Sequence, residues 1–345
     1  MKRPNDTSHI AYIVLLVVAV AAATIYGCTA TGGNTSIASR EEHFNYTLHF
    51  CSEGNCLQRL AELLSSAKES VKCAFYRADI PIISSIPKSA AAEIVVDEKA
   101  KVEAANFSNV IIYRVKSKGI MHNKYCVIDN AAVLTGSFNP ISAARRDYNN
   151  LLIINSSALA GFYGSDFERL KLGSRGKTPT AAAVVNGKAK RRAALLNETA
   201  VEVYFCPEDD CAAAVKEKIK NASKTIIFAA YSFTHPEIAN ELIIKSSEET
   251  HVAGLIEKST AGSKYSKYAA MVANGIDIKL EDSKKLMHHK FFVIDNETVI
   301  TGSFNPTKNA DERNDENMIM IRNKAVAEKY VEEFGRIRHL SNANQ

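Results

Sequence analysis

The chain has no tryptophan, few prolines and no strong excess of charge of one sign. Its 345 residues include 8 Pro and 16 Gly, and the formal net charge is only +5. This composition excludes a collagen-like chain and a highly charged disordered one. Hydrophobic residues make up 46% of the chain, which is enough for one large or two medium domains with a buried core. The small basic excess is compatible with a partner that carries phosphate groups.

Acidic residues are nearly absent near the N-terminus. Lys2 and Arg3 precede an apolar run of about 17 residues, from Ile10 to Tyr26, which is short for a membrane-spanning helix. We expect residues 1–28 to form a signal anchor or a cleaved signal peptide. Since positive charge stays on the cytoplasmic side, the N-terminus would face the cytoplasm. The rest of the chain would then be membrane-anchored and lie outside the cytoplasm, or be secreted. Lipidation at Cys28 is a third alternative, and a simple anchor is favoured.

Cysteine is also sparse, with seven in the chain, yet four of these residues repeat a spacing. Cys51 and Cys56 follow a Phe and lie five apart, as do Cys206 and Cys211. In an oxidising compartment each pair could form a local disulfide, and equally each could be a pair of small buried side chains. Two further cysteines lie in apolar, strand-like runs and are expected in the core: Cys73 and Cys126.

The chain contains an internal repeat. The segment IMHNKYCVIDNAAVLTGSFNP at 120–140 returns 166 positions later as LMHHKFFVIDNETVITGSFNP at 286–306. Upstream, AFYRADIP at 74–81 matches AAYSFTHP at 229–236. Self-similarity at a fixed offset predicts two copies of one structural unit.

Strand-like and helix-like segments alternate along each copy. Leu57, Leu60 and Leu64 fall at helical spacing, and β-branched runs such as Val252 to Ile256 are typical of strands. The alternation favours an α/β sheet with helices on its faces. The expected boundaries are 44–170 for the first unit, 171–199 for an exposed basic linker, and 200–340 for the second unit.

Each copy carries a histidine and a lysine two positions apart, followed by an apolar run that ends in an aspartate. Residues two apart on a strand share a face, so each His and Lys should point the same way. A second strand then leads to Gly-Ser-Phe-Asn, which can return beside that pair. The chemical groups of the two copies are His122, Lys124, Asp129, Ser137 and Asn139, then His288, Lys290, Asp295, Ser303 and Asn305.

These residue types suit the cleavage of a phosphodiester. Lysine and asparagine can hold phosphate oxygens and take up developing charge. Two imidazoles can take different roles, since one can attack phosphorus and the other can protonate the leaving group. This chemistry requires no metal. A lone His-x-Lys is more often a surface pair on a strand, but two matched blocks with the same donors at the same offsets argue against chance.

The two blocks resemble the paired His-x-Lys-x4-Asp motifs of the phospholipase D superfamily. The short units look most like its compact branch, which includes a bacterial endonuclease and mitochondrial cardiolipin hydrolase, where one unit dimerises. The resemblance covers nearly all of residues 44–340. It implies two tandem α/β units related by a pseudo-two-fold, with one active site at their interface and no obligate dimer. It also implies a phosphohistidine intermediate resolved by water, without a cofactor or a metal.

The resemblance also implies roles. His122 and His288 would be nucleophile and general acid, with His122 favoured as the nucleophile. Asp129 and Asp295 would be structural partners near the site. The phosphate ligands would be Lys124, Lys290, Asn139 and Asn305, assisted by Ser137 and Ser303. The family usually adds an acidic residue eleven positions after the Asn, which gives Glu316 in the second copy but Asn150 in the first.

The resemblance indicates the reaction better than the substrate. A phospholipid is slightly favoured, because an anchor would hold the site close to a bilayer. The alternative is a metal-independent endonuclease acting on DNA or RNA, favoured by the compact branch, the basic linker and the lack of an obvious interfacial amphipathic helix. Transfer of a phosphatidyl group to an alcohol ranks third. The intact His, Lys and Asn of both copies argue against a catalytically inactive binding module.

Overall fold

The computed structural model describes residues 42–100, 102, 107–174 and 192–343. Within these ranges no helix has the length and apolar character needed to cross a membrane. The apolar run at 10–26 and Cys28 lie outside the described residues, and the expectations about them stay predictions.

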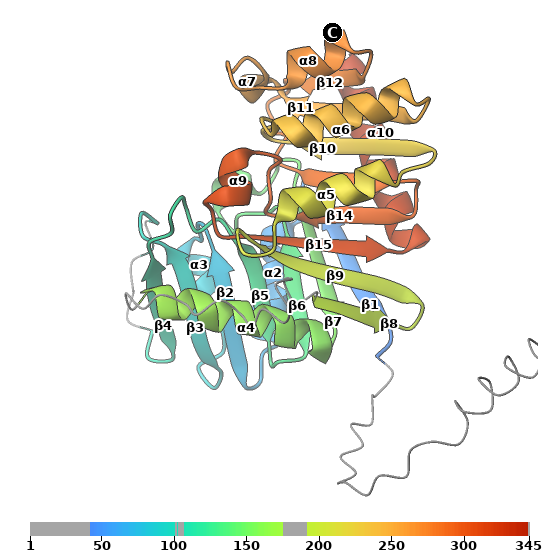
Figure 1. The fold of residues 1–345 in the computed structure, drawn as a ribbon. Coiled ribbons are helices and arrows are strands. Elements are labelled where there is room, and N and C mark those ends of the chain that lie inside the picture. Colours follow the sequence, from blue (N-terminus) through green and yellow to red (C-terminus); the bar gives the residue numbers. More distant parts are fainter. Residues whose placement is uncertain (1–41, 101, 103–106, 175–191, 344–345) are drawn as a thin grey trace, which may run out of the picture. The chain divides into compact units, whose positions relative to one another are not determined.

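The first half of the chain forms a mixed sheet of seven strands in the order β1-β7-β6-β5-β2-β3-β4 (Figure 1). Strands β2, β3 and β4 are parallel to one another, and the other neighbours are antiparallel. The strands are β1 (Asn45–Phe50), β2 (Ser70–Phe75), β3 (Ala91–Asp97), β4 (Val110–Val115), β5 (Lys124–Ile128), β6 (Ala132–Gly136) and β7 (Asn150–Asn155).

The second half repeats this sheet strand for strand and adds one edge strand. Its order is β12-β11-β10-β13-β14-β15-β9-β8, in which β8 has no counterpart in the first sheet. The repeat seen in the sequence is therefore a repeat of the α/β fold. The strands are β8 (Arg192–Leu196), β9 (Thr199–Cys206), β10 (Thr225–Ala230), β11 (His251–Glu257), β12 (Asp277–Glu281), β13 (Lys290–Ile294), β14 (Thr298–Gly302) and β15 (Glu316–Arg322).

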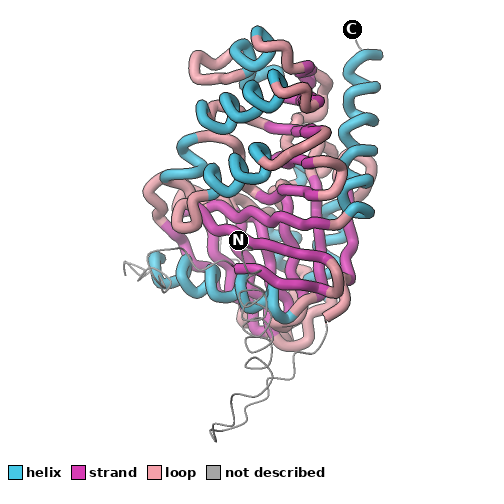
Figure 2. The backbone as a smooth tube through the Cα atoms, turned by 45° about the vertical axis from the view of Figure 1, so that its right-hand side comes forward, coloured by secondary structure: helices cyan, strands magenta, loops and turns pink. Residues whose placement is uncertain are grey.

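Helices cover the faces of both sheets (Figure 2). Helix α2 shows the local reason, because the Asn55 side chain accepts a hydrogen bond from the Gln58 amide at its start, and Cys56, Leu60 and Leu64 form its buried stripe. The helices are α2 (Cys56–Ser65), α3 (Ile80–Ile83), the 3-10 turn η1 (Ser142–Ala144), α4 (Ser157–Ser174), α5 (Cys211–Lys220), α6 (Pro236–Ser247), α7 (Lys258–Ala261), α8 (Tyr268–Ala273), α9 (Lys308–Glu312) and α10 (Lys324–Ala343).

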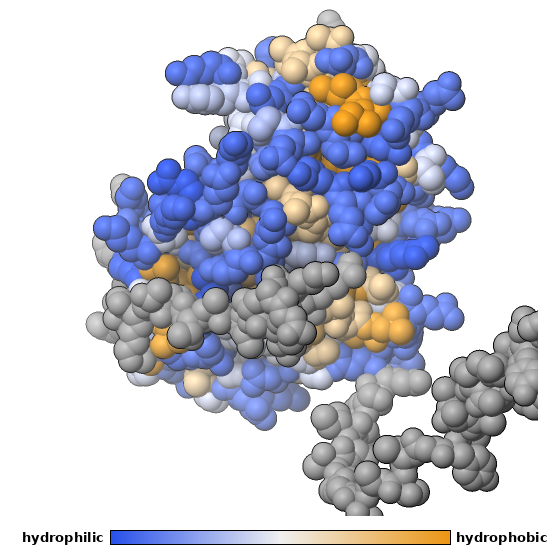
Figure 3. All heavy atoms as spheres, viewed as in Figure 1, coloured by the Kyte–Doolittle hydropathy of each residue, from blue (hydrophilic) through white to orange (hydrophobic). Residues whose placement is uncertain are grey.

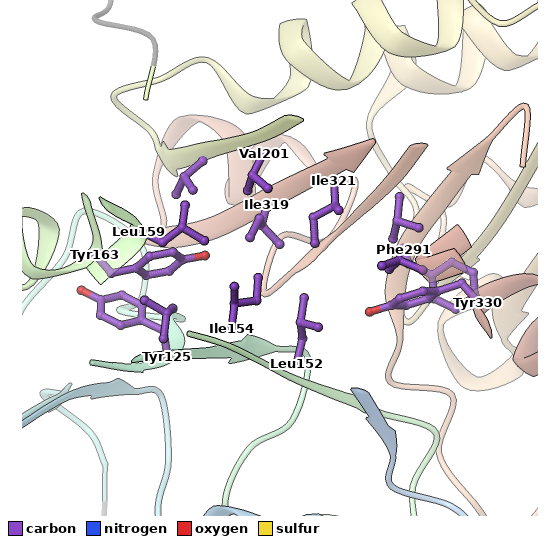
Figure 4. Packing of buried hydrophobic residues seen from close by; sticks show 14 of the residues in the cluster. Tyr125, Leu152, Ile154, Leu159, Tyr163, Val201, Phe291, Ile319, Ile321 and Tyr330 are labelled. Atoms are coloured by element: carbon purple, nitrogen blue, oxygen red, sulfur yellow. The ribbon is translucent and has the colours of Figure 1, made fainter. Parts of the chain in front are cut away.

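The two halves share one central hydrophobic core. Both sheets contribute to it, together with Tyr163 and Phe167 of α4 and Tyr330 and Phe334 of α10. Figure 4 shows Tyr163 and Tyr330 of this cluster with buried side chains from both sheets. Helix α4 also contacts β8 and β9 of the other sheet. Because burial of apolar surface drives folding, each half completes the core of the other.

The expected linker at 171–199 is shorter in the structure. Its first residues, to Ser174, belong to α4, and Arg192–Leu196 form the edge strand β8. Strand β8 pairs antiparallel with β9, from Arg192 opposite Val203 to Leu196 opposite Thr199. A short run rich in Ala becomes a strand here because β9 offers an open edge. Residues 175–191 lie outside the described part.

Three disulfides link the six described cysteines. Cys51–Cys56 and Cys206–Cys211 are the local pairs that the sequence left as one of two alternatives. Cys73 and Cys126 lie in the core, as expected, and they also form the third disulfide, which the sequence did not predict. They lie directly opposite each other on β2 and β5, with their Cα atoms 4.1 Å apart.

Candidate active site

The two motif histidines lie in one pocket between the halves. His122 lies two residues before Lys124, the first residue of β5, and His288 lies two residues before Lys290, the first residue of β13. Both line a pocket of about 510 Å³, together with Asn139 and Asn305. The structure thus brings four of the predicted site residues from two distant segments into one cavity.

Each motif is held in place by the opposite half. The backbone amide of His122 donates to the carbonyl oxygen of Asp315 at 2.8 Å, and that of His288 donates to the carbonyl oxygen of Tyr148 at 3.0 Å. Such reciprocal contacts are what a pseudo-two-fold relation between two units requires. They fix the two histidines relative to each other.

The side chains of the histidines are anchored across the same interface. Nδ1 of His122 lies 2.8 and 2.9 Å from the two carboxylate oxygens of Glu316. Nδ1 of His288 lies 2.8 Å from Oδ1 of Asn149. An Nδ1–H that donates to such an acceptor leaves Nε2 as the nitrogen free for chemistry. The two anchors differ, since one is a carboxylate and the other an amide.

The expected counterpart of Glu316 was Asn150, and this count is wrong by one residue. Asn149 lies ten positions after Asn139, whereas Glu316 lies eleven positions after Asn305, and Asn149 takes the place beside the histidine. The Asn150 amide instead donates to Thr301 Oγ1 at 3.1 Å. Its true counterpart is Asn317, whose amide donates to Thr135 Oγ1 at 2.7 Å.

The two motif serines are fully buried and do not line the pocket. Ser137 Oγ donates to Asn149 Oδ1 at 3.0 Å, and Ser303 Oγ donates to a Glu316 carboxylate oxygen at 2.5 Å. The serines therefore do not lie where the expected binding of substrate phosphate would place them. They orient the side chains that anchor the histidines.

The glycines that precede these serines are needed for close packing. Gly136 and Gly302 have φ of 145° and 143°, and a Cβ on either would lie 2.3 Å from the carbonyl oxygen of Asn150 or Asn317. Only glycine suits such a backbone approach. This contact explains why a glycine precedes the serine in both halves.

Both motif lysines are buried beside a tyrosine. Nζ of Lys124 donates to the carbonyl oxygen of His122, and Nζ of Lys290 to that of His288, each at 2.7 Å. The two ammonium groups lie 5.8 and 5.5 Å from the ring centres of Tyr76 and Tyr231, in that order. The sequence reasoning missed these tyrosines, although they occupy matching positions in AFYRADIP and AAYSFTHP.

Burial sets the electrostatics of the pocket. It lowers the pKa of Lys124 to about 7 and holds the pKa of Lys290 well below its usual value. Burial and the two ammonium groups together hold the pKa values of His122 and His288 well below normal. Burial also raises the pKa of Glu316 to about 7. A bound anion would favour the charged forms of the lysines and histidines, so the site is suited to a phosphodiester.

The two aspartates of the motifs lie away from the pocket, which corrects the expectation that they are near the site. The carboxylate of Asp129 accepts hydrogen bonds from the amides of Lys68, Glu69 and Ser70 at 2.8–2.9 Å. Asp295 binds the equivalent turn before β10 in the same way. Each sits beyond the far end of its strand, about 17 Å along the chain from the lysine. Their role is to hold the start of a neighbouring strand.

In the described ranges, no three His, Cys, Asp or Glu side chains are grouped so that they could hold a metal ion. Metal-independent chemistry stays a prediction from the residue types.

Comparisons with known proteins cover both halves. The family model described as cardiolipin synthase, PLD-like domain, matches residues 60–171 and 215–338. A phospholipase D from Rickettsia prowazekii is 32% identical over 148 residues, which make up 43% of this chain and 72% of that protein. The mitochondrial cardiolipin hydrolase of Xenopus laevis is 26% identical over 120 residues, 35% of this chain and 57% of that protein.

A solved structure shows the same two-sheet fold. The phosphatidylserine synthase of Haemophilus influenzae aligns over 85% of both chains with a TM-score of 0.62 and 12% identity. The family model covers well over half of this chain, once in each half. The chain therefore belongs to the phospholipase D superfamily, as a phosphodiester hydrolase with two PLD-like units in tandem.

Proposed function

We propose that this protein hydrolyses phosphodiesters through a covalent phosphohistidine on His122. The observation that carries the proposal is the contact between Nδ1 of His122 and the carboxylate of Glu316. It holds the ring with Nε2 free in a pocket that also contains His288. Because both histidines come from one chain, a single chain should be active.

In the first step, the Nε2 lone pair of His122 attacks phosphorus, and the bond from phosphorus to the leaving oxygen breaks. That oxygen takes the proton carried on Nε2 of His288. In the second step, water attacks phosphorus and gives a proton to His288. The phosphorus–nitrogen bond then breaks, its electron pair returns to His122, and a phosphomonoester is released. Lysine and asparagine donors hold the other phosphate oxygens: Lys124, Lys290, Asn139 and Asn305.

The two anchors support this division of roles. An imidazole phosphorylated on Nε2 and protonated on Nδ1 carries a positive charge, which the Glu316 carboxylate can stabilise. The neutral amide of Asn149 offers no such charge to His288. His288 needs its proton only when substrate is bound, and the substrate anion raises its pKa at that moment.

Replacing each histidine by asparagine tests the proposal. Both variants should lose several orders of magnitude in turnover of an ordinary diester. With a p-nitrophenyl leaving group, which needs little protonation, His288→Asn should recover activity and accumulate phosphohistidine, while His122→Asn stays inactive. The reverse pattern would exchange the two roles. If each variant kept about half of the activity on every substrate, the single site would be wrong.

Two substrate classes suit this chemistry. The names of the relatives, phospholipase D and mitochondrial cardiolipin hydrolase, support a phospholipid. The charged and aromatic groups that flank the reaction pocket support a nucleic acid strand.

A further inference from the structure

The reaction pocket is the middle part of a longer trough. A pocket of about 540 Å³ on the first half shares Arg77 and Ile141 with it, and a pocket of about 760 Å³ on the second half shares Tyr231 and Asn305. We name these flanking pockets the first arm and the second arm. A trough that continues on both sides of the reacting groups suits a substrate that extends in both directions from the cleaved bond.

The second arm is basic and carries an exposed aromatic ring. Lys264, Lys267 and Lys308 line it, and no Asp or Glu does. Tyr265 is 64% exposed, and Nζ of Lys264 lies 5.0 Å from its ring centre. Throughout the described ranges, none of these three lysines forms an ion pair, whereas the nearby Lys258 is paired with Asp282 at 2.8 Å. The three charges are thus available to a ligand.

The first arm has a different character. Its two cations, Arg77 and Lys99, share the lining with the carboxylate of Asp79, and apolar side chains such as Val102 complete it. The two arms are therefore not equivalent, although the halves repeat the same fold. The excess of positive charge is larger in the second arm, where three lysines have no carboxylate among them.

The exposed hydrophobic side chains do not favour docking of the trough onto a bilayer. Of the large hydrophobic side chains exposed in the described residues, only Tyr265 lines the trough. Hydrophobic areas on the face shown in Figure 3 are small and separated by hydrophilic ones. Insertion into a lipid interface needs a contiguous apolar surface. Lysines beside an exposed aromatic ring are instead the combination that binds unpaired nucleic acid, because every base can stack on such a ring.

We propose that the second arm binds single-stranded nucleic acid on the leaving-group side of the cleaved phosphate. The three lysines contact flanking phosphates, and an unpaired base stacks on Tyr265. The inference rests on the proposed function, because the leaving oxygen departs toward His288, which belongs to the half that builds this arm. Only an unpaired strand exposes the face of a base, so duplex should be the poorer substrate.

The test compares cleavage of a labelled single-stranded oligonucleotide with hydrolysis of bis(p-nitrophenyl) phosphate, which is too small to reach the arm. The triple variant Lys264→Ala/Lys267→Ala/Lys308→Ala should lower kcat/KM on the oligonucleotide by about 10- to 100-fold at low salt. It should also make the slope of log kcat/KM against log salt concentration less steep by about 2, because each of the three lost phosphate contacts contributes roughly 0.7 to that slope. Hydrolysis of the small diester should stay within about twofold of native.

Two further variants sharpen the result. Tyr265→Ala should lower kcat/KM on the strand by about 10-fold or more, and Tyr265→Phe should restore it, because stacking needs the ring and not the hydroxyl. Lys220, Lys224 and Lys324 lie at the opposite ends of the strands from the pocket and are exposed. Their triple alanine variant is the matched control and should cleave the strand like native. If the arm variant loses folded structure, Lys264→Ala and Lys308→Ala singly should each reduce the salt slope by about 0.7.

The outcomes separate this inference from the proposed function. If the arm variants cleave the strand as fast as the native protein and with the same salt slope, the inference is wrong. The phosphohistidine mechanism is then unaffected. If the native protein hydrolyses labelled phospholipid vesicles but does not cleave the oligonucleotide, the inference is also wrong and the mechanism is again unaffected. Failure of the native protein to hydrolyse even the small diester counts against the proposed function itself.

Discussion

Asn149 lies beside His288 in the place that Glu316 occupies beside His122. Both side chains place an oxygen 2.8 Å from Nδ1 of their histidine, and both accept a hydrogen bond from a motif serine. Only Glu316 can carry a negative charge. The two halves thus hold their histidines in the same geometry but in different electrostatic surroundings.

Exchanging the charge at these two positions should affect catalysis unequally. Glu316→Gln should lower kcat by roughly 10²- to 10⁴-fold, because the amide cannot stabilise a cationic phosphohistidine. Asn149→Asp should keep most of the turnover and move the alkaline limb of the kcat/KM profile to higher pH, since a carboxylate raises the pKa of His288. Rapid-quench measurements and pH profiles check both. Equal losses in the two variants would contradict the assignment of His122 as nucleophile.

Glu316 should also destabilise the fold at neutral pH. Its pKa is raised by burial from 4.5 to about 7, so its contribution to stability is fully present below about pH 4.5 and is lost as the pH rises through 7. The free energy of unfolding of Glu316→Gln, relative to that of the native protein, should therefore rise as the pH is raised from 5 to 8, by up to about 3 kcal/mol. Urea unfolding at the two pH values measures the difference. A difference that does not change with pH would show that the carboxylate is not perturbed.

The disulfide between β2 and β5 should contribute more to stability than either local one. It spans a sequence separation of 53, against 5 for Cys51–Cys56, and a longer closed loop restricts the unfolded chain more. Cys73→Ala/Cys126→Ala should lower the free energy of unfolding by about 4 kcal/mol, and the matched Cys51→Ala/Cys56→Ala variant by about 2 kcal/mol. Of the seven cysteines, one should react with a thiol reagent in the unfolded, unreduced chain. Seven reactive thiols would show that the bonds are absent.

We propose that the described part of the chain lies outside the cytoplasm, where disulfides persist. Protease added to intact cells or spheroplasts, with any outer barrier removed, should digest it. Protection until the membrane is opened would show that the orientation inferred from Lys2 and Arg3 is wrong.

Activity should survive an excess of chelator. The proposed steps use imidazole, ammonium and amide groups, and the two motif lysines would repel a cation from the pocket. The measurement is hydrolysis of bis(p-nitrophenyl) phosphate before and after dialysis against EDTA. Full loss of activity that Mg²⁺ or Zn²⁺ restores would rule out the mechanism as written.

The sequence predicted the parts of the site that lie within the repeated blocks. His122, Lys124 and Asn139 are placed by one strand, one turn and a second strand, so their spacing already indicates a shared location. Their meeting with the second set was expected from the resemblance to the phospholipase D superfamily. The alternation of strands and helices likewise predicted the α/β class.

What the sequence could not predict depends on contacts between distant segments. Asn149 was missed because it lies ten positions after Asn139, one fewer than separate Glu316 from Asn305, and only the structure shows this difference. Asp129 was expected near the site from the family resemblance, but the strand between it and His122 carries it to the other end of the sheet. The Cys73–Cys126 bond depends on the register of β2 against β5, which neither run of residues specifies.

The shared core of the two halves has a consequence for how such a site can evolve. In an assembly of two identical chains, any substitution appears beside both histidines at once, so the two rings must keep equal surroundings. Here a single polypeptide builds both sides around one cluster of apolar side chains from α4, α10 and both sheets. Each copy can then change alone, as Glu316 and Asn149 and the two unlike arms of the trough have done. Covalent fusion thus permits an asymmetric enzyme inside a symmetric fold.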